Sequence, residues 1–140
     1  MLLDETELMY VSVQGVSNAR GAFDKLESKL PDLKGRKFYG YLKGRKFYGY
    51  FNPDTDEYRA CVATAAEDPR PETIGLQQWT IPKGLYTYEK IEDWNSKKHL
   101  IAPAFERMIR ENSGVIDWSR PILEFYKSMN ELRLLVPVKA

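Results

Sequence analysis

The spacing of apolar residues along the chain predicts two helices among a series of short strands. Where apolar side chains recur at every second residue they face one side of an extended chain, and this pattern indicates strands. It covers residues 7–13, 57–64, 76–81, 85–91, 120–126 and 131–138. Apolar residues that recur every three or four positions instead indicate helices at about 17–30 and 101–112.

The ends of both helices carry recognisable signals. Ser17 or Asn18 can cap the first helix, because a short side-chain oxygen accepts hydrogen bonds from the free amides of the first turn. Pro31 ends that helix. Pro103 is tolerated in the first turn of the second helix, and Gly114 can terminate it.

The elements follow the same order twice, as strand, helix, strand and strand. The two halves span about residues 5–64 and 76–138, and a loop over 65–75 links them. We expect one α+β domain covering 1–140, in which duplicated strand-helix-strand-strand units form a single antiparallel sheet with both helices on one face. The opposite face would then be open and concave, and a ligand groove is expected there.

A nine-residue segment is repeated without change, at 33–41 and 42–50. The unit is shorter than the ~20 residues of a solenoid repeat, and the sequence does not distinguish a natural from an engineered duplication. Because the copies are identical, the pattern fits either register. We expect the second copy to form the strand, since it continues into the turn-forming residues 52–54. The first copy would lengthen the loop or the hairpin, and the duplication allows strand exchange in a homodimer.

Composition is that of an ordinary globular protein with an aromatic excess, at 43% hydrophobic, 29% charged and 13% aromatic residues. No apolar run approaches the roughly 18 residues needed to span a bilayer, and the acidic N-terminus is not a signal peptide. The net charge of +1 gives no electrostatic case for nucleic acid, because the basic cluster arises from the duplication. We therefore expect a cytoplasmic protein with neither a membrane nor a nucleic acid as partner.

The chain offers little for metal or thiol chemistry. Cys61 is the only cysteine, which excludes an internal disulfide and fits a reducing compartment. His99 is the only histidine, so neither a Cys/His zinc site nor a Cys-His catalytic pair is expected, and no cofactor is implied. We interpret Cys61 as a small core residue and His99 as a surface residue at a helix entry.

Glu124 is the strongest candidate for a functional residue. It lies between apolar neighbours on the strand predicted at 120–126. A lone carboxylate in such a strand either faces water or lines a pocket, because unpaired acids are seldom buried. Our hypothesis places Glu124 at the floor of an aromatic-lined groove.

Three local patterns occur in a characteristic order. The first is Phe-Tyr-Gly-Tyr-Phe-Asn-Pro at 47–53, with Glu-Tyr-Arg-Ala-Cys-Val at 57–62. The second is Trp-Thr-Ile-Pro-Lys-Gly-Leu-Tyr at 79–86, and the third is Arg-Pro-Ile-Leu-Glu-Phe-Tyr at 120–126, followed by 132–138. In this order the patterns resemble the first hairpin, the Ile-Pro-x-Gly-x-Tyr segment and the terminal hairpin of the GyrI-like small-molecule-binding family. That family includes effector domains of multidrug-sensing transcription regulators and stand-alone DNA-gyrase-modulating proteins.

The resemblance implies that Glu124 is the buried acid of a groove that binds hydrophobic, aromatic or cationic small molecules. Aromatic rings would supply apolar area and cation–π contacts. The candidate ligand-binding residues are Glu124, Tyr126, Tyr50, Trp79, Tyr86, Tyr48, Tyr58 and Tyr88. For each aromatic residue the alternative is packing in the core or in a cross-strand ladder. Trp94, Trp118 and Arg120 are instead expected to have structural roles.

Two functions from different classes fit these residues. The first is a binding module that captures amphipathic molecules for sensing or sequestration. The second, implied by some GyrI-like proteins, is a hydrolase that opens cyclopropane-containing DNA-alkylating compounds. In that case Glu124 would orient or deprotonate water and Tyr86 would position the electrophile. A third function, as a protein–protein modulator of a topoisomerase, would use a surface that the sequence does not identify.

Overall fold

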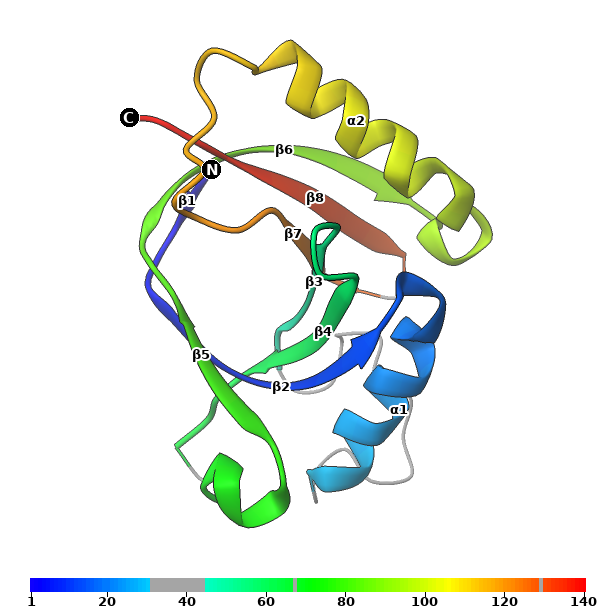
Figure 1. Cartoon of the computed structure of the whole chain (residues 1–140), viewed down its shortest axis with the longest axis vertical. Helices are drawn as coiled ribbons and strands as arrows, with labels where there is room; N and C mark the ends of the chain where they lie inside the picture. The colour runs from blue at the N-terminus through cyan, green and yellow to red at the C-terminus, as the bar shows by residue number, and fades with distance from the viewer. Residues whose placement is uncertain (31–44, 67, 129) are drawn as a thin grey trace.

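The computed structural model describes residues 1–30, 45–66, 68–128 and 130–140, and the strands of these residues form one antiparallel sheet (Figure 1). The strands are β1 (Leu2–Leu3), β2 (Thr6–Gln14), β3 (Phe47–Asn52), β4 (Glu57–Ala63), β5 (Gln77–Ile81), β6 (Gly84–Glu92), β7 (Leu123–Tyr126) and β8 (Glu131–Val138). The helices are α1 (Ala19–Lys29) and α2 (Ile101–Glu111). Short 3₁₀ turns are η1 (Val16–Asn18), η2 (Pro71–Ile74), η3 (Trp94–Ser96) and η4 (Lys98–Leu100).

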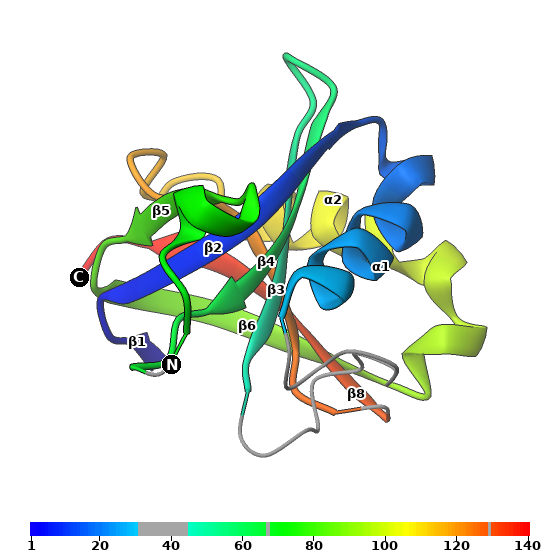
Figure 2. The same cartoon turned by 90° about the horizontal axis from the view of Figure 1, so that it is seen from below.

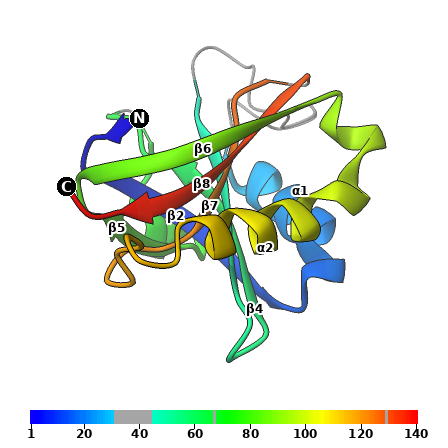
Figure 3. The ribbon, with the colours of Figure 1, turned by 90° about the horizontal axis from the view of Figure 1, so that it is seen from above.

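The order of strands across the sheet is β1-β6-β8-β7-β3-β4-β2-β5. The order β7-β8-β6 in the second half of the chain mirrors the order β3-β4-β2 in the first, and the halves join where β3 pairs with β7. Figures 1 and 3 show α1 and α2 on the same, outer side of the curled sheet. The predicted fold class is therefore confirmed as α+β, with one antiparallel sheet and both helices on one face.

Two element ends differ from the predictions. No side chain caps α1, because the Asn18 amide instead donates to the backbone oxygen of Gln14 at 2.6 Å. The strand expected from residue 120 begins only at Leu123, since Arg120 is held by contacts with other strands and Pro121 lacks the amide that a ladder needs.

The second copy of the repeated segment forms β3, as predicted. It pairs with β4 on one side and with β7 on the other, and Asn52 accepts the Asp54 amide in the turn that follows. The resulting hairpin extends beyond the rest of the sheet (Figure 2). The first copy, at 33–41, lies outside the described residues.

An ion pair anchors the approach to β3. Arg45 donates to both carboxylate oxygens of Asp68, at 2.8 and 3.0 Å, and both side chains are buried. Asp68 also accepts the backbone amide of Ala65 at 2.8 Å. Such a two-point pair fixes geometry as well as adding energy, so it ties the start of β3 to the loop after β4.

Each face of the sheet has its own core. The outer core lies between the sheet and the helices, and it includes Phe23 and Leu26 of α1 and Met108 of α2. The inner core lies on the face without helices and takes one or two residues from every strand: Leu3, Leu8, Tyr10, Tyr48, Cys61, Ile81, Tyr86, Leu123 and Leu135. Strands at opposite edges can share one cluster only because the sheet curls around this face. The face is thus concave, and where the inner core lies it is filled by side chains, unlike the open groove that we expected there.

Neither helix in the described part of the chain is long and apolar enough to cross a membrane.

Candidate ligand-binding site

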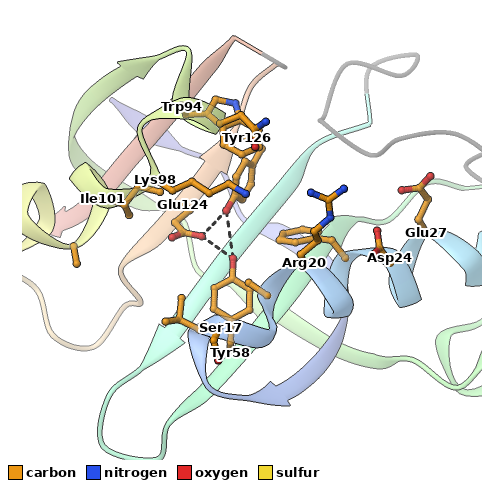
Figure 4. A pocket seen from close by; sticks show the side chains of 15 residues that line it. Ser17, Arg20, Asp24, Glu27, Tyr58, Trp94, Lys98, Ile101, Glu124 and Tyr126 are labelled. Atoms are coloured by element: carbon orange, nitrogen blue, oxygen red, sulfur yellow. Dashed lines mark hydrogen bonds between the residues drawn. The ribbon is translucent and has the colours of Figure 1, made fainter.

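A cavity of about 620 Å³ lies on the helix-bearing side of the sheet, between α1 and the segment that leads into α2. Its floor is formed by Tyr58 of β4 and by Glu124 and Tyr126 of β7 (Figure 4). Drug-sized ligands occupy pockets of roughly 300–1,000 Å³, so the cavity has room for one. The expectation that a ligand groove would lie on the face opposite the helices is therefore wrong for the site around Glu124.

The Glu124 carboxylate is held by two tyrosine hydroxyl groups. Tyr58 and Tyr126 donate to the same oxygen, Oε1, at 2.7 and 2.8 Å. The two hydroxyl oxygens are 3.4 Å apart. Oε2 accepts no hydrogen bond from any residue that the structure describes, and the side chain is only half-buried. The carboxylate thus has one saturated oxygen and a second that can face a ligand.

Gly49 of β3 makes this arrangement sterically possible. It lies between β4 and β7, directly opposite Glu124 in the ladder. A Cβ atom at this position would lie 2.2 Å from the Glu124 carboxylate and 2.2 Å from the Tyr58 hydroxyl. Only a glycine therefore leaves the space in which these two side chains, two strands apart, meet over the sheet.

Burial controls the protonation of this cluster. Desolvation raises the pKa of Glu124 above its ordinary value, while the hydrogen bonds from Tyr58 and Tyr126 oppose that rise. Burial also raises the pKa values of Tyr58 and Tyr126 well above their ordinary value, and the negative charge of Glu124 adds to this effect. Both hydroxyl groups hence stay protonated and keep donating near neutral pH.

Aromatic rings from three parts of the chain surround the carboxylate. Phe23 of α1 makes edge-to-face contacts with Tyr58 and Tyr126, at centroid distances of 6.3 and 5.3 Å. Trp94 of η3 contacts Tyr126 in the same way at 5.1 Å, and its indole nitrogen donates to the backbone oxygen of Ser128 at 3.0 Å. These contacts fix the rings, so the apolar wall of the cavity is formed before any ligand binds.

The mouth of the cavity carries charges of both signs. Arg20, Asp24 and Glu27 line it from successive turns of α1, and Lys98 lines it from η4 (Figure 4). Arg20, Asp24 and Lys98 are exposed, so solvent screens their charges. Glu27 and Glu124 are the half-buried charges of the lining, and Glu124 is the one on the floor of the cavity.

The structure divides the predicted ligand-binding residues between the two faces of the sheet. Glu124, Tyr58 and Tyr126 line the cavity together. The aromatic side chains that lie on the inner face, away from Glu124, are those of Tyr48, Tyr50, Trp79 and Tyr86. Strand alternation explains the split, because Tyr48 and Tyr50 flank Gly49 and point away from the side on which Glu124 lies.

Tyr86 and Tyr88 correct the prediction in different ways. The hydroxyl group of Tyr86 donates to the backbone oxygen of Pro121 at 3.1 Å, and burial raises its pKa to about 12. Because Tyr86 belongs to the inner core, it has no place in the cavity as a catalytic partner of Glu124. Tyr88 is 40% exposed and lies under the guanidinium of Arg133.

Sequence reasoning missed the residues that α1 and η3 contribute. The sequence places Phe23 on the apolar stripe of the first predicted helix and predicts a structural role for Trp94. A signal did exist for the mouth of the cavity, since Arg20, Asp24 and Glu27 recur at a helical spacing on the polar side of α1. Nothing in that spacing shows which element they face.

Arg120 has the local, structural role that we expected. It donates to the backbone oxygens of Leu85 and Val138, at 3.0 and 2.8 Å, and to Asp117 at 3.2 Å. Its guanidinium fills the space over Gly84, where a Cβ would lie 2.1 Å from it. Arg120 therefore joins β6 and β8 at the point where the chain approaches β7.

The described residues contain no group of three or more His, Cys, Asp or Glu side chains that could hold a metal ion.

Known proteins share the fold of this chain but not its sequence. Neither a family model nor a curated protein matches the sequence. The structure of SAV2435 bound to tetraphenylphosphonium matches with a TM-score of 0.63 and 14% identity, over 100% of this chain and 92% of that one. An integron cassette protein from the mobile metagenome of Vibrio cholerae matches with a TM-score of 0.62 and 14% identity, over 99% and 94% of the two chains. A hydrolase from Listeria innocua matches with a TM-score of 0.52 and 11% identity, over 99% and 89%. At these identities the likenesses show a common fold.

Proposed function

We propose that the protein binds amphipathic organic cations in the cavity between α1 and η4. The observation that carries this proposal is the Glu124 carboxylate, which has one oxygen saturated by Tyr58 and Tyr126 and a second oxygen without a described partner. A ligand with a positive charge would lie against that second oxygen. Its apolar groups would pack on the rings of Phe23, Trp94 and Tyr126.

Electrostatics favours a cation over a neutral ligand. The cavity strips water from the carboxylate, which is why burial raises the pKa of Glu124. A bound positive charge replaces the lost hydration, and the attraction is stronger here than at an exposed carboxylate because less solvent screens it. Because the tyrosine hydroxyl groups already satisfy Oε1, the positive charge of the ligand would meet Oε2.

The shared fold supports the same chemistry. SAV2435 was solved with tetraphenylphosphonium, a permanent cation with four aromatic rings. Our proposal extends this class of ligand to the present chain on the strength of its own cavity, carboxylate and aromatic wall.

Tetraphenylphosphonium titrated calorimetrically into the protein tests this function. We expect binding in the micromolar range, and a loss of roughly 10- to 100-fold in Glu124→Gln, which keeps the shape of the side chain and removes its charge. Glu72→Gln is the matched control, because this exposed carboxylate on η2 lies outside the cavity lining and should leave the affinity unchanged. Neutral triphenylphosphine oxide should bind the wild type and Glu124→Gln about equally. Equal affinity of tetraphenylphosphonium for Glu124→Gln and the wild type would contradict the proposal.

A hydrolase is the second candidate, favoured by a carboxylate whose pKa is raised and whose second oxygen has no partner among the described residues. Such a group can accept a proton from water, and the fold is shared with a hydrolase from Listeria innocua. Tyr58 or Tyr126, not Tyr86, would then position the electrophile. Mass spectrometry of a cyclopropane-containing alkylating compound should show ring opening by the wild type and none by Glu124→Gln. Unchanged compound with the wild type would exclude this candidate.

A further inference from the structure

A second aromatic cluster surrounds Arg59 on the inner face of the sheet. The guanidinium carbon of Arg59 lies 4.5 Å from the ring centroid of Tyr10, 4.6 Å from that of Trp79 and 5.3 Å from that of Tyr50. The rings come from β2, β5 and β3, on both sides of Arg59 in β4. They contact one another as well, with Trp79 at 6.2 Å from Tyr10 and 5.0 Å from Tyr50. The guanidinium is therefore held in place by a rigid aromatic wall.

The hydrogen bonds of Arg59 leave one edge of its guanidinium open. Its Nε donates to Oε2 of Glu57 at 3.0 Å, and the same oxygen accepts the Ser12 hydroxyl at 2.8 Å. The two terminal nitrogens donate to no residue among those the structure describes, and the side chain is 21% exposed. Nearby, the Tyr10 hydroxyl donates to the side-chain oxygen of exposed Gln77 at 2.7 Å, so the Gln77 amide nitrogen remains as a further donor.

We propose that this cluster is a second binding site, for small aromatic carboxylates, in which the terminal nitrogens of Arg59 donate to both carboxylate oxygens. A guanidinium presents parallel donors that match a carboxylate, and aromatic faces on three sides reduce its hydration. The ring of the ligand would lie against Trp79 and Tyr50, whose half-buried rings leave surface available. The site goes beyond the proposed function, because it lies on the other face of the sheet and selects the opposite charge.

The second half of the chain supplies a natural comparison. Arg133 of β8 also donates through Nε to the glutamate two residues before it, Glu131, at 2.7 Å. Its guanidinium lies 5.0 Å from the ring of Tyr88, and among the described residues no second aromatic ring packs on it. Arg133 thus shares the charge and the carboxylate partner of Arg59 and lacks the three-ring wall.

The indole N–H signals of the three tryptophans allow a direct test by nuclear magnetic resonance. Trp79 lies in the proposed site, Trp94 lines the cavity and Trp118 is exposed, and tryptophan-to-phenylalanine variants assign each signal. We expect 2-naphthoate to shift the Trp79 signal with a dissociation constant of roughly 1 mM or lower, without moving the Trp94 signal. Tetraphenylphosphonium should do the reverse, so failure at one site is distinguishable from failure at the other.

Substitutions of Arg59 test whether its guanidinium binds the carboxylate of 2-naphthoate. Arg59→Gln should weaken 2-naphthoate at least tenfold, Arg59→Lys should weaken it less, and Arg133→Gln should leave it unchanged. The methyl ester of 2-naphthoate, which lacks the charge, should not saturate the Trp79 shift. Retained tetraphenylphosphonium binding shows that Arg59→Gln is folded. The proposal is overturned if 2-naphthoate leaves Trp79 unmoved, or if it binds Arg59→Gln as well as the wild type.

Discussion

Glu124 shows how much of a site depends on side-chain direction along one strand. The alternation of β7 puts Glu124 and Tyr126 on one face and Leu123 and Phe125 on the other, and the sequence alone predicts this pairing. The contact of Tyr58 with Glu124 does not follow from the sequence in the same way, because it depends on which strand lies next but one to β7. The sequence names the acid and both tyrosines as candidates, and the order of strands in the sheet brings Tyr58 to the acid.

The pH dependence of cation binding follows from the same carboxylate. Because burial raises the pKa of Glu124, the site loses its negative charge at a higher pH than an exposed glutamate would. We expect the affinity for tetraphenylphosphonium to be constant well above this raised pKa and to fall as the pH drops through it. The charge of the ligand is permanent, so calorimetric titrations from pH 7.5 to about 4.5 report on the protein alone.

Two variants identify the group that titrates. In Glu124→Gln the weak residual affinity should no longer depend on pH. His99→Gln should retain the full dependence, although His99 adjoins Lys98 at the mouth of the cavity. If the pH dependence disappears in His99→Gln and persists in Glu124→Gln, the titrating group is His99 and not Glu124, which would contradict our proposal.

At the scale of an element, β3 is the strand on which the sequence was most ambiguous. Either copy of the repeat satisfies the alternation, and only the turn residues after 50 favoured the second. The structure shows a further requirement, which strand propensity does not predict. The strand needs a residue without a Cβ atom where Glu124 and Tyr58 meet. Both copies carry a glycine at this place, so the pattern could not have resolved the register.

Gly49→Ala should therefore disrupt the cavity. The added methyl group would lie 2.2 Å from the Glu124 carboxylate and from the Tyr58 hydroxyl, and overpacking of this kind costs about 1–3 kcal/mol. We expect Gly49→Ala to lower the midpoint of urea unfolding and to weaken tetraphenylphosphonium binding.

The identical first copy makes the double variant informative. A shift of one copy would bring Gly40 into the position of Gly49, and closing a hairpin nine residues longer costs only about 1 kcal/mol. That exchange would limit the loss of stability in Gly49→Ala. Adding Gly40→Ala would remove the alternative glycine, so the double variant should be less stable still. If the double variant is only as unstable as Gly49→Ala, no exchange of copies takes place.

At the scale of the whole molecule, the curl of the sheet decides which predicted residues act together. Pattern reasoning correctly gave one α+β sheet with two helices on one face, because hydrophobic alternation, helical stripes and turn residues all act locally. It expected the groove around Glu124 on the face without helices, whereas the cavity beside Glu124 lies on the helix-bearing side, because the pattern does not show how each face is filled once the sheet curls. Because of that curl, Tyr48 and Tyr86 are buried in the inner core.

Arg120 bridges the ends of two neighbouring strands, β6 and β8. Its terminal nitrogens bind backbone oxygens of β6 and β8, and lysine cannot donate to both in the same geometry. We expect Arg120→Lys to lower the free energy of unfolding by roughly 1–3 kcal/mol, measured by urea denaturation, since it leaves a partly buried backbone acceptor without its partner.

The control for Arg120 is a fully exposed arginine. Arg70→Lys, at a side chain that is 84% exposed, should change stability by less than about 0.5 kcal/mol. Arg120 is absent from the cavity lining, so Arg120→Lys should still bind tetraphenylphosphonium under conditions in which it is folded. A loss of stability no larger than that of Arg70→Lys would show that the two carbonyl contacts contribute little.

Tyr58 and Arg59 are consecutive residues of β4, yet one contacts the acid of the cavity and the other lies within the aromatic wall of the opposite face. Inserting one residue before them would move Tyr58 into the place of Arg59 and turn Arg59 to the outer face, whereas deleting one would move Arg59 into the place of Tyr58. The deletion would thus put a cation on the floor of the cavity, and the insertion would put a phenol among the rings of the inner face. Evolution can therefore vary the chemistry of this strand by substitution far more readily than by a change in its length.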